Sequence, residues 1–159
     1  MGSGKSAVGR SLARHLRVPF YDSDAEIERR TGVDIPFIFE KEGEAGFRER
    51  EREAIAALTQ LRRIVLATGG GAILLPESRR LLAENGWVVY LRTSVAQQAE
   101  RVKPGRHRPL LNGVGDATAR LHELMAVRDP LYGSIADVTV STDGRQIKAV
   151  VRDIIQMIR

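Results

Sequence analysis

The sequence lacks cysteine altogether, which excludes disulfide bridges and zinc sites built from thiolates. It also lacks any apolar run near the roughly 20 residues that a membrane span requires, and no signal peptide precedes its first charged residue. A chain of 159 residues removes roughly 70% of its unfolded surface from water on folding, so it needs neither disulfides nor a structural metal. We therefore expect one globular domain in the cytoplasm, with no partner membrane.

Aromatic residues are scarce, at 5% of the chain, although Lys and Arg (25) outnumber Asp and Glu (20). Proteins that bind nucleic acid usually gather their basic residues on one face and interleave them with aromatic residues. Here the longest charge-rich stretch, residues 40–52, mixes both signs. The net charge of +5 therefore favours small anionic ligands, and we expect no nucleic-acid partner.

Helical and extended patterns alternate along the chain. Short apolar segments predict strands at residues 18–22, 64–67, 87–91 and 137–140. Apolar periodicity and capping residues predict helices that start near Gly4, Pro76, Ser94, Ala117 and Ile147, with two or three more between residues 23 and 61. Strands that are apolar on both faces and alternate with helices indicate a parallel sheet covered on both sides, so the predicted class is α/β. Residues 103–115 have no periodicity and are predicted to form a loop.

The chain opens with GSGKS at residues 2–6 and then enters a helix, which is the tail of the phosphate-binding pattern G-x-x-x-x-G-K-[ST]. Glycines let backbone N–H groups surround phosphate oxygens, and the helix N-terminus adds positive potential. Lys5 then reaches the β- and γ-phosphates, and the Ser6 hydroxyl is a ligand for Mg²⁺. The first glycine of the pattern and its usual preceding strand would lie before Met1, so we expect upstream residues to be missing. A Gly/Ser-rich start without function is the alternative, and the helix that follows Lys5 argues against it.

Two carboxylates, Asp22 and Asp24, follow the first predicted strand. The other internal apolar strands run into glycines or into Arg92. Asp22 is therefore the candidate to hold Mg²⁺ together with Ser6, through water because that ion keeps several waters. Capping of the next helix is an alternative role, and it accounts for one of the two carboxylates but not for both.

Six segments resemble the shikimate kinase family, in order and approximate spacing, over essentially the whole chain. They are GSGKS at 2–6, FYDSD at 20–24, the stretch from Gly43-Glu44 to FRERE at 47–51, TGGG at 68–71, RPLL at 108–111 and RDPLY at 128–132. The resemblance implies a P-loop, nucleoside-monophosphate-kinase-like three-layer sandwich with a central parallel sheet. Within this single domain, it implies a substrate-binding segment at residues 23–62 and a lid at 103–115.

The resemblance also implies an activity: transfer of the γ-phosphoryl group of ATP to the 3-hydroxyl of shikimate. The product would be shikimate 3-phosphate, an intermediate of aromatic amino-acid biosynthesis. The partners would be ATP and shikimate, the cofactor one Mg²⁺ bound with ATP, and the enzyme a monomer.

Shikimate is a small carboxylate that bears hydroxyl groups, so its site needs cations and polar groups. Arg48 has Glu51 one turn later to orient its guanidinium, and Arg128 ends the apolar stripe of the helix that starts near Ala117. A guanidinium takes a carboxylate bidentately. The resemblance implies that Arg48 and Arg128 grip the substrate carboxylate. The alternatives are a surface ion pair for Arg48 and a snorkelling side chain for Arg128.

Three consecutive glycines, residues 69–71, directly follow a predicted buried strand. They allow backbone to approach a ligand with no side chain between, although a plain tight turn is the alternative. The resemblance implies that Gly70 and Gly71 contact shikimate and that Asp24 accepts a hydrogen bond from its reacting hydroxyl. Asp24 then either takes the hydroxyl proton or only orients the group.

Residues 101–108 form a basic stretch that contains Pro104 and Gly105. Such a stretch suits a lid that closes over ATP and excludes water, although many basic loops are simply solvated. The resemblance implies that Arg108 acts on the transferred group with Lys5. We expect no role for His107, because a lone histidine in a loop usually has none. The resemblance also implies ATP contacts from the following residues: Gly2, Ser3, Gly4, Lys5, Ser6, Ala7, Arg101, Arg108 and Arg145.

Other functions fit parts of this pattern. A gluconate or nucleoside-monophosphate kinase shares the phosphate loop and the lid, but the pair Asp22 and Asp24 with the triple glycine argues against it. A nucleotide-binding regulatory module would lack phosphoryl transfer, and a nucleic-acid binder would show steeply salt-dependent binding.

Overall fold

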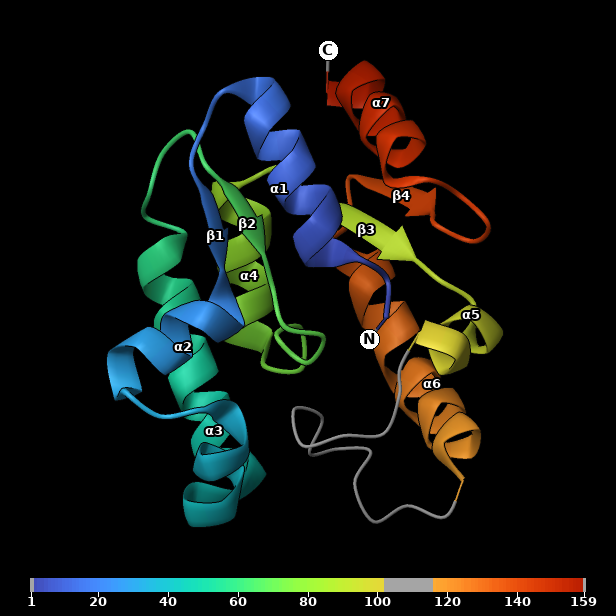
Figure 1. The fold of residues 1–159 in the computed structure, drawn as a ribbon. Helices are drawn as coiled ribbons and strands as arrows, with labels where there is room; N and C mark the ends of the chain where they lie inside the picture. The colour runs from blue at the N-terminus through green and yellow to red at the C-terminus, as the bar shows by residue number, and fades with distance from the viewer. Residues whose placement is uncertain (1, 102–115, 159) are drawn as a thin grey trace.

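The computed structural model describes residues 2–101 and 116–158, and it confirms the α/β class (Figure 1). Its elements in chain order are α1 (Lys5–Leu16), β1 (Phe20–Asp22), α2 (Ser23–Thr31), α3 (Ile35–Leu58), β2 (Val65–Ala67), α4 (Pro76–Asn85), β3 (Val89–Arg92), α5 (Val95–Arg101), α6 (Ala117–Ile135), β4 (Val138–Ser141) and α7 (Ile147–Ile158). All predicted strands and helices are present, and each strand begins slightly later than predicted. The loop and lid predicted at 103–115 lie outside the described residues.

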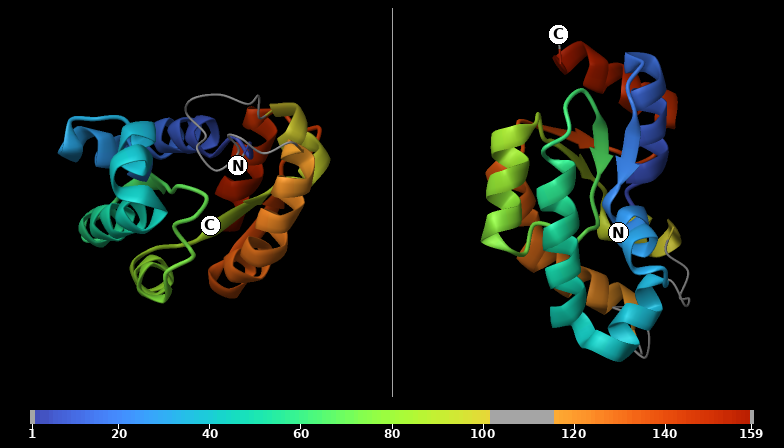
Figure 2. Two further views of the ribbon diagram at one scale, coloured as in Figure 1. Left: turned by 90° about the horizontal axis from the view of Figure 1, so that it is seen from below. Right: turned by 90° about the vertical axis from the view of Figure 1, so that its left-hand side faces the viewer.

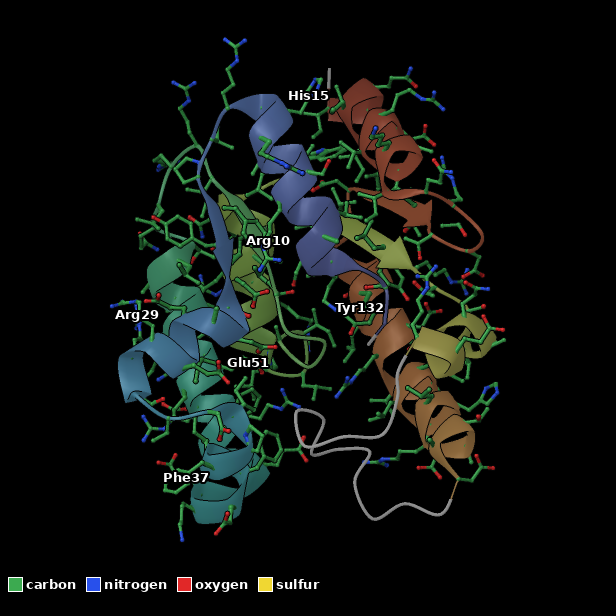
Figure 3. The ribbon with its side chains drawn as sticks, in the orientation of Figure 1. Arg10, His15, Arg29, Phe37, Glu51 and Tyr132 are labelled. Carbon is green, nitrogen blue, oxygen red and sulfur yellow. The ribbon has the colours of Figure 1, made fainter. Side chains whose placement is uncertain are left out.

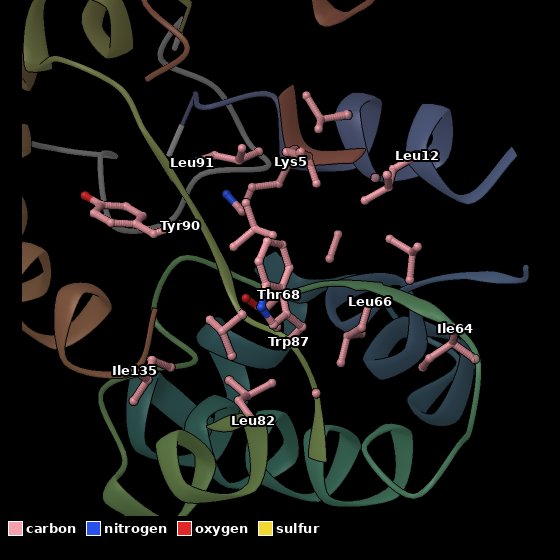
Figure 4. Close-up of a pocket in the computed structure, with 18 of the residues that line it drawn as sticks. Lys5, Leu12, Ile64, Leu66, Thr68, Leu82, Trp87, Tyr90, Leu91 and Ile135 are labelled. Carbon is pink, nitrogen blue, oxygen red and sulfur yellow. The ribbon is translucent and has the colours of Figure 1, made fainter. Parts of the chain in front are cut away.

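The strands pair in parallel, as predicted, but in two separate pairs. β1 pairs with β2, with Phe20 opposite Val65, and β3 pairs with β4, with Val89 opposite Val138. Between the two pairs lies a cavity of about 510 Å³, which we call the central cavity (Figure 4). Apolar side chains of β2, β3 and α1 line it, among them Leu66, Leu91 and Leu12.

Helices lie on both sides of the strands. α1 packs against α7 on one side, and α4 packs against α6 on the other, which gives three layers (Figure 2). The core of the first side joins α1, β4 and α7 through the following buried residues: Val8, Leu12, Val140, Val150, Val151 and Ile154. A second core joins α2 to α3 through Ile27, Ile38, Phe47 and Ala54.

The helix boundaries have local causes. Asp22, Asp34 and Asp116 cap α2, α3 and α6, because their side chains accept hydrogen bonds from the first free N–H groups. Gly43 interrupts α3 with φ 70° and ψ −174°, so this element is two helical stretches joined at a kink, within the expected two or three helices. Within residues 2–101 and 116–158, no helix is long and apolar enough to cross a membrane.

Candidate active site

Residues 68–71, which we call the glycine turn, follow β2 directly. The Gly69 N–H donates to the Ser23 hydroxyl of α2 at 2.9 Å, and the Ala72 N–H donates to the Gly69 carbonyl at 3.1 Å. From the far side, the Tyr132 hydroxyl of α6 donates to the Gly70 carbonyl. The turn is thus fixed from both halves of the molecule, since α2 lies beside β1 and α6 lies beside β3 (Figure 1).

Polar side chains lie close against the backbone of the glycine turn. A Cβ at Gly69 would lie 2.7 Å from Glu51 Oε1 and 2.8 Å from Asp24 Oδ1. A Cβ at Gly71 would overlap the guanidinium of Arg48. A plain tight turn does not require this close approach, so the structure favours a binding surface of bare backbone here.

Arg48 and Glu51 form a buried ion pair on α3. Arg48 Nη1 lies 2.6 Å from Glu51 Oε2, and the two side chains are 11% and 3% exposed. Arg48 Nη2 also reaches the exposed Glu44, at 3.2 Å. The interpretation of Arg48 as a surface ion pair is therefore wrong, because the guanidinium is enclosed between Glu51 and the glycine turn.

Arg128 also lies inside the protein, at 5% exposure, so it is not a snorkelling side chain. Burial lowers the pKa of its guanidinium, and the nearby positive charge of Arg48 lowers it further, against the opposing effect of Tyr132. Two poorly solvated cations that repel each other favour an anion between them. The structure therefore brings Arg48 of α3 and Arg128 of α6 together, as the sequence predicts.

Asp24 stands at the start of α2 beside this pair. Burial raises its pKa to about 6, with further contributions from the charges of Glu51 and Asp22, while Lys5 and Arg48 act in the opposite direction. Burial likewise raises the pKa of Glu51. A carboxyl group whose pKa lies near neutrality is suited to accept a proton during a reaction.

Three buried polar atoms of this cluster have no hydrogen-bond partner in the described part of the chain: Asp24 Oδ1, Arg48 Nε and Glu51 Oε1. Buried polar atoms are nearly always paired, so an unpaired set marks the place of a polar ligand or of water. Glu51 belongs to α3, and Tyr132 lies on α6 (Figure 3).

The phosphate loop adjoins the same cluster. Gly2 and Gly4 have φ of 68° and 79°, in the left-handed region that favours glycine, and α1 begins at Lys5. The charge of Lys5 acts on Asp24. Lys5 also lines the central cavity together with Gly70 (Figure 4). Lys5, the glycine turn and the two arginines therefore converge on one region.

Ser6 and Asp22, the residues expected to hold Mg²⁺, are in direct contact. The Ser6 hydroxyl donates to Asp22 Oδ2 at 2.7 Å, while Asp22 Oδ1 accepts from the Asp24 and Ala25 N–H groups at 3.0 and 3.4 Å. Asp22 is thus both the helix cap and the neighbour of the phosphate-loop hydroxyl. One carboxylate and one hydroxyl oxygen, with phosphate oxygens and water to complete the shell, fit Mg²⁺. No cluster of three or more acidic or histidine ligands exists among the residues that the structure describes.

Arg101 and Arg145, which are expected to contact the nucleotide, lie in different surroundings. Arg101 donates to the Gly2 carbonyl at 3.1 Å and to the Thr142 carbonyl at 3.3 Å, so it holds the phosphate loop against the end of β4. Arg145 points to α7, where it pairs with Asp153 at 2.5 Å. Arg108 and His107 lie outside the described residues.

The sequence did not point to Tyr132 as a site residue, nor to the close approach of Glu51 to Asp24. Tyr132 belongs to the quoted segment RDPLY, and its spacing of four residues from Arg128 places both on one face of α6. That spacing was the available signal. The approach of Glu51 to Asp24 across Gly69 had no signal, because it joins three separate elements.

A family model described as shikimate kinase matches residues 1–159. Among curated proteins, the shikimate kinase of Hahella chejuensis is 52% identical over 159 residues, which are 100% of this chain and 82% of the relative. The shikimate kinase of Thioalkalivibrio sulfidiphilus is 56% identical over 154 residues, with 97% and 80% covered.

Solved structures give the same result. Shikimate kinase from Acinetobacter baumannii in complex with shikimate is 47% identical, with a TM-score of 0.97 over 99% of this chain and 88% of that one. Shikimate kinase from Aquifex aeolicus is 37% identical, with a TM-score of 0.84 over 99% and 91%.

Proposed function

Because this chain belongs to the shikimate kinase family and so has ATP-dependent shikimate kinase activity, we propose that it phosphorylates the 3-hydroxyl of shikimate. This reaction serves aromatic amino-acid biosynthesis. One observation carries the assignment of the site: the buried Arg128, the largely buried Arg48 and three buried polar atoms without a partner in the described part of the chain surround a turn of bare backbone. The rival kinases and the non-catalytic module do not explain the match of the whole chain to this family.

In the proposed complex, Arg48 and Arg128 hold the substrate carboxylate. Each guanidinium presents planar N–H donors to a carboxylate, and Arg48 Nε is a buried donor without a partner in the described part of the chain. A bound carboxylate also relieves the repulsion between the two cations. Gly70 and Gly71 supply the bare backbone against which the ring of the substrate lies.

Asp24 receives the reacting hydroxyl. Its Oδ1 is buried, and no hydrogen-bond partner for it lies within residues 2–101 and 116–158. We propose that this oxygen accepts the hydrogen bond from the 3-hydroxyl and takes the proton as the oxygen–phosphorus bond forms. A pKa of about 6 leaves Asp24 ionised at neutral pH and still basic enough to accept that proton.

Residues of the phosphate loop position the donor. We propose that Gly2, Ser3, Gly4, Lys5, Ser6 and Ala7 contact the phosphates of ATP. Lys5 neutralises charge on the transferred group, and Ser6 with Asp22 holds Mg²⁺ through hydroxyl and carboxylate oxygens. When bound, the ion neutralises charge on the phosphate oxygens. Arg101 and Arg145 are proposed for the adenine end, and Arg108 for the lid.

The domain proposal concerns the central cavity. We propose that an extended apolar segment on the amino side of Met1 fills it as a strand between β2 and β3. Both strands lack a partner on the cavity side among the described residues, and Ser3 and Lys5 line the cavity. Four exposed apolar residues also line it, as expected for the wall of a strand site: Leu16, Leu61, Trp87 and Ile158.

This domain proposal is tested by fusing a strand-length apolar segment ahead of Met1, about 5–6 residues long. A matched fusion carries Asp at alternate positions. The apolar fusion should raise the melting temperature above that of the Asp fusion, and equal melting temperatures would contradict the strand.

The remaining proposals are that the enzyme works as a monomer, since all named site residues come from one chain, and that it works in the cytoplasm.

The substrate is tested with purified protein, Mg²⁺ and ATP, by following ADP release with shikimate, gluconate or a nucleoside monophosphate as acceptor. We expect turnover with shikimate alone and a product whose phosphorus couples to the proton on C3 in NMR spectra. Phosphate on another hydroxyl would refute the proposed position of Asp24.

A further inference from the structure

Tyr132 connects the two halves of the substrate site. It lies on α6 one turn after Arg128, and its hydroxyl donates to the Gly70 carbonyl of the glycine turn. Burial raises the pKa of the same hydroxyl, and the charge of Arg128 acts on it in the opposite direction. The Tyr132 hydroxyl therefore lies between the charge of Arg128 and the backbone that follows β2.

The bond to Gly70 fixes more than one atom. The Gly70 carbonyl and the Gly71 N–H belong to one planar peptide group, so holding the carbonyl also sets the direction of that N–H. The Gly71 Cα is in turn the surface against which the Arg48 guanidinium packs, since any Cβ there would overlap it. The position of Arg48 thus depends on the peptide group that Tyr132 holds.

The aromatic ring of Tyr132 has a separate, structural role. Its centroid lies 4.7 Å from that of Tyr90 on β3. The Tyr90 hydroxyl donates to Asp129 of α6 at 2.7 Å, whereas the Tyr132 hydroxyl donates to the glycine turn. The two tyrosines therefore share a ring contact but differ in what their hydroxyls hold, which allows the roles to be separated.

We infer that Tyr132 is a positioning residue for shikimate binding: its hydroxyl sets the Gly70–Gly71 peptide and so places Arg48 opposite Arg128. The hydroxyl acts through these groups and takes no part in the transfer itself. This inference rests on the proposed roles of Arg48 and Arg128 as carboxylate ligands.

The test compares Tyr132→Phe with Tyr90→Phe in the purified protein, using steady-state kinetics with ATP and shikimate. Each variant loses one hydrogen-bonded hydroxyl and keeps its ring. Tyr132→Phe should raise the KM for shikimate about fivefold to tenfold, the range expected for one lost hydrogen bond. Its KM for ATP should change less than twofold. Tyr90→Phe should leave both KM values within twofold even where it lowers the melting temperature.

A double-mutant cycle with Arg48→Ala separates positioning from general stability. In the Arg48→Ala background, Tyr132→Phe should raise the KM for shikimate threefold or less, because the group that it places is gone. A larger effect in that background overturns the inference, as does an unchanged KM for Tyr132→Phe alone. A wild-type protein that fails to phosphorylate shikimate would instead refute the proposed function.

Discussion

Replacement of Glu51 by Gln tests how charge is balanced in the substrate site. Glu51 is 2% exposed, and Glu51 Oε2 lies 2.6 Å from Arg48 Nη1. Gln keeps the shape but removes the charge, which leaves Arg48 and Arg128 buried with less opposing charge. Removing one partner of a buried ion pair costs about 3–5 kcal/mol. We expect the lower end, about 3 kcal/mol, because Glu44 still reaches Arg48 at 3.2 Å.

The loss should appear as a fall in melting temperature on the order of 6–12 °C for a domain of this size. Glu44→Gln is the matched control. It removes the other carboxylate that contacts Arg48, but this one is exposed, so its loss should cost about 0–1 kcal/mol. Saturating shikimate should raise the melting temperature of Glu51→Gln more than that of wild type, because its carboxylate replaces the missing charge.

The same variant should change the pH dependence of catalysis. The Glu51 charge is one cause of the raised pKa of Asp24, about 6, so its removal should lower that pKa. The acidic limb of the profile of kcat/KM against pH should therefore move to lower pH. An unmoved acidic limb, together with stability equal to that of Glu44→Gln, would refute the charge balance described here.

Other variants test the remaining parts of the site. Asp24→Asn should abolish turnover and yet raise the free energy of unfolding at pH 8 by about 1–3 kcal/mol. Because the pKa of Asp24 is raised in the folded state, that state keeps a proton that the unfolded state has lost, and wild type loses stability as pH rises from about 4 to about 6. Denaturant titrations of both proteins at pH 4 and pH 8 measure this loss. Equal stability of wild type and Asp24→Asn at pH 8 would contradict the raised pKa. Lys5→Ala should lower kcat at least about 100-fold, while Arg128→Ala should mainly raise the KM for shikimate. Equal changes in kcat and KM for both variants would show that Lys5 does not act on transfer and Arg128 on substrate binding. Gly69→Ala should destabilise the protein by about 1–3 kcal/mol, because its Cβ would lie 2.7 Å from Glu51 Oε1; an unchanged unfolding midpoint would show that this approach is not tight.

Local signals in the sequence account for most of the fold. The helix Pro76–Asn85 begins where predicted, because Pro76 suits the first helical turn. The predicted strands are present but begin later. The pairing of strands in two separate sheets, β1 with β2 and β3 with β4, was not predicted, because the pattern of apolar residues does not state which strands are neighbours.

The site was predictable where residue type and position at a strand or helix end define the chemistry. Asp22 meets Ser6 as expected, and Arg48 meets Glu51 one turn away. The contact of Tyr132 with Gly70 was not predictable, because it joins residues 62 positions apart and depends on the packing of α6 against the turn. Arg145 was expected near the nucleotide, but its ion pair with Asp153 depends on how α7 folds back.

The central claim is that Arg48 and Arg128 form one carboxylate site beside Lys5 and the glycine turn. Calorimetric titration of the wild-type protein with shikimate and with its methyl ester tests this most directly, because the ester removes only the negative charge. We predict that the acid binds at least about tenfold more tightly than the ester, and that the Arg48→Ala, Arg128→Ala double variant binds both equally. Equal affinity of the wild-type protein for acid and ester would contradict the account.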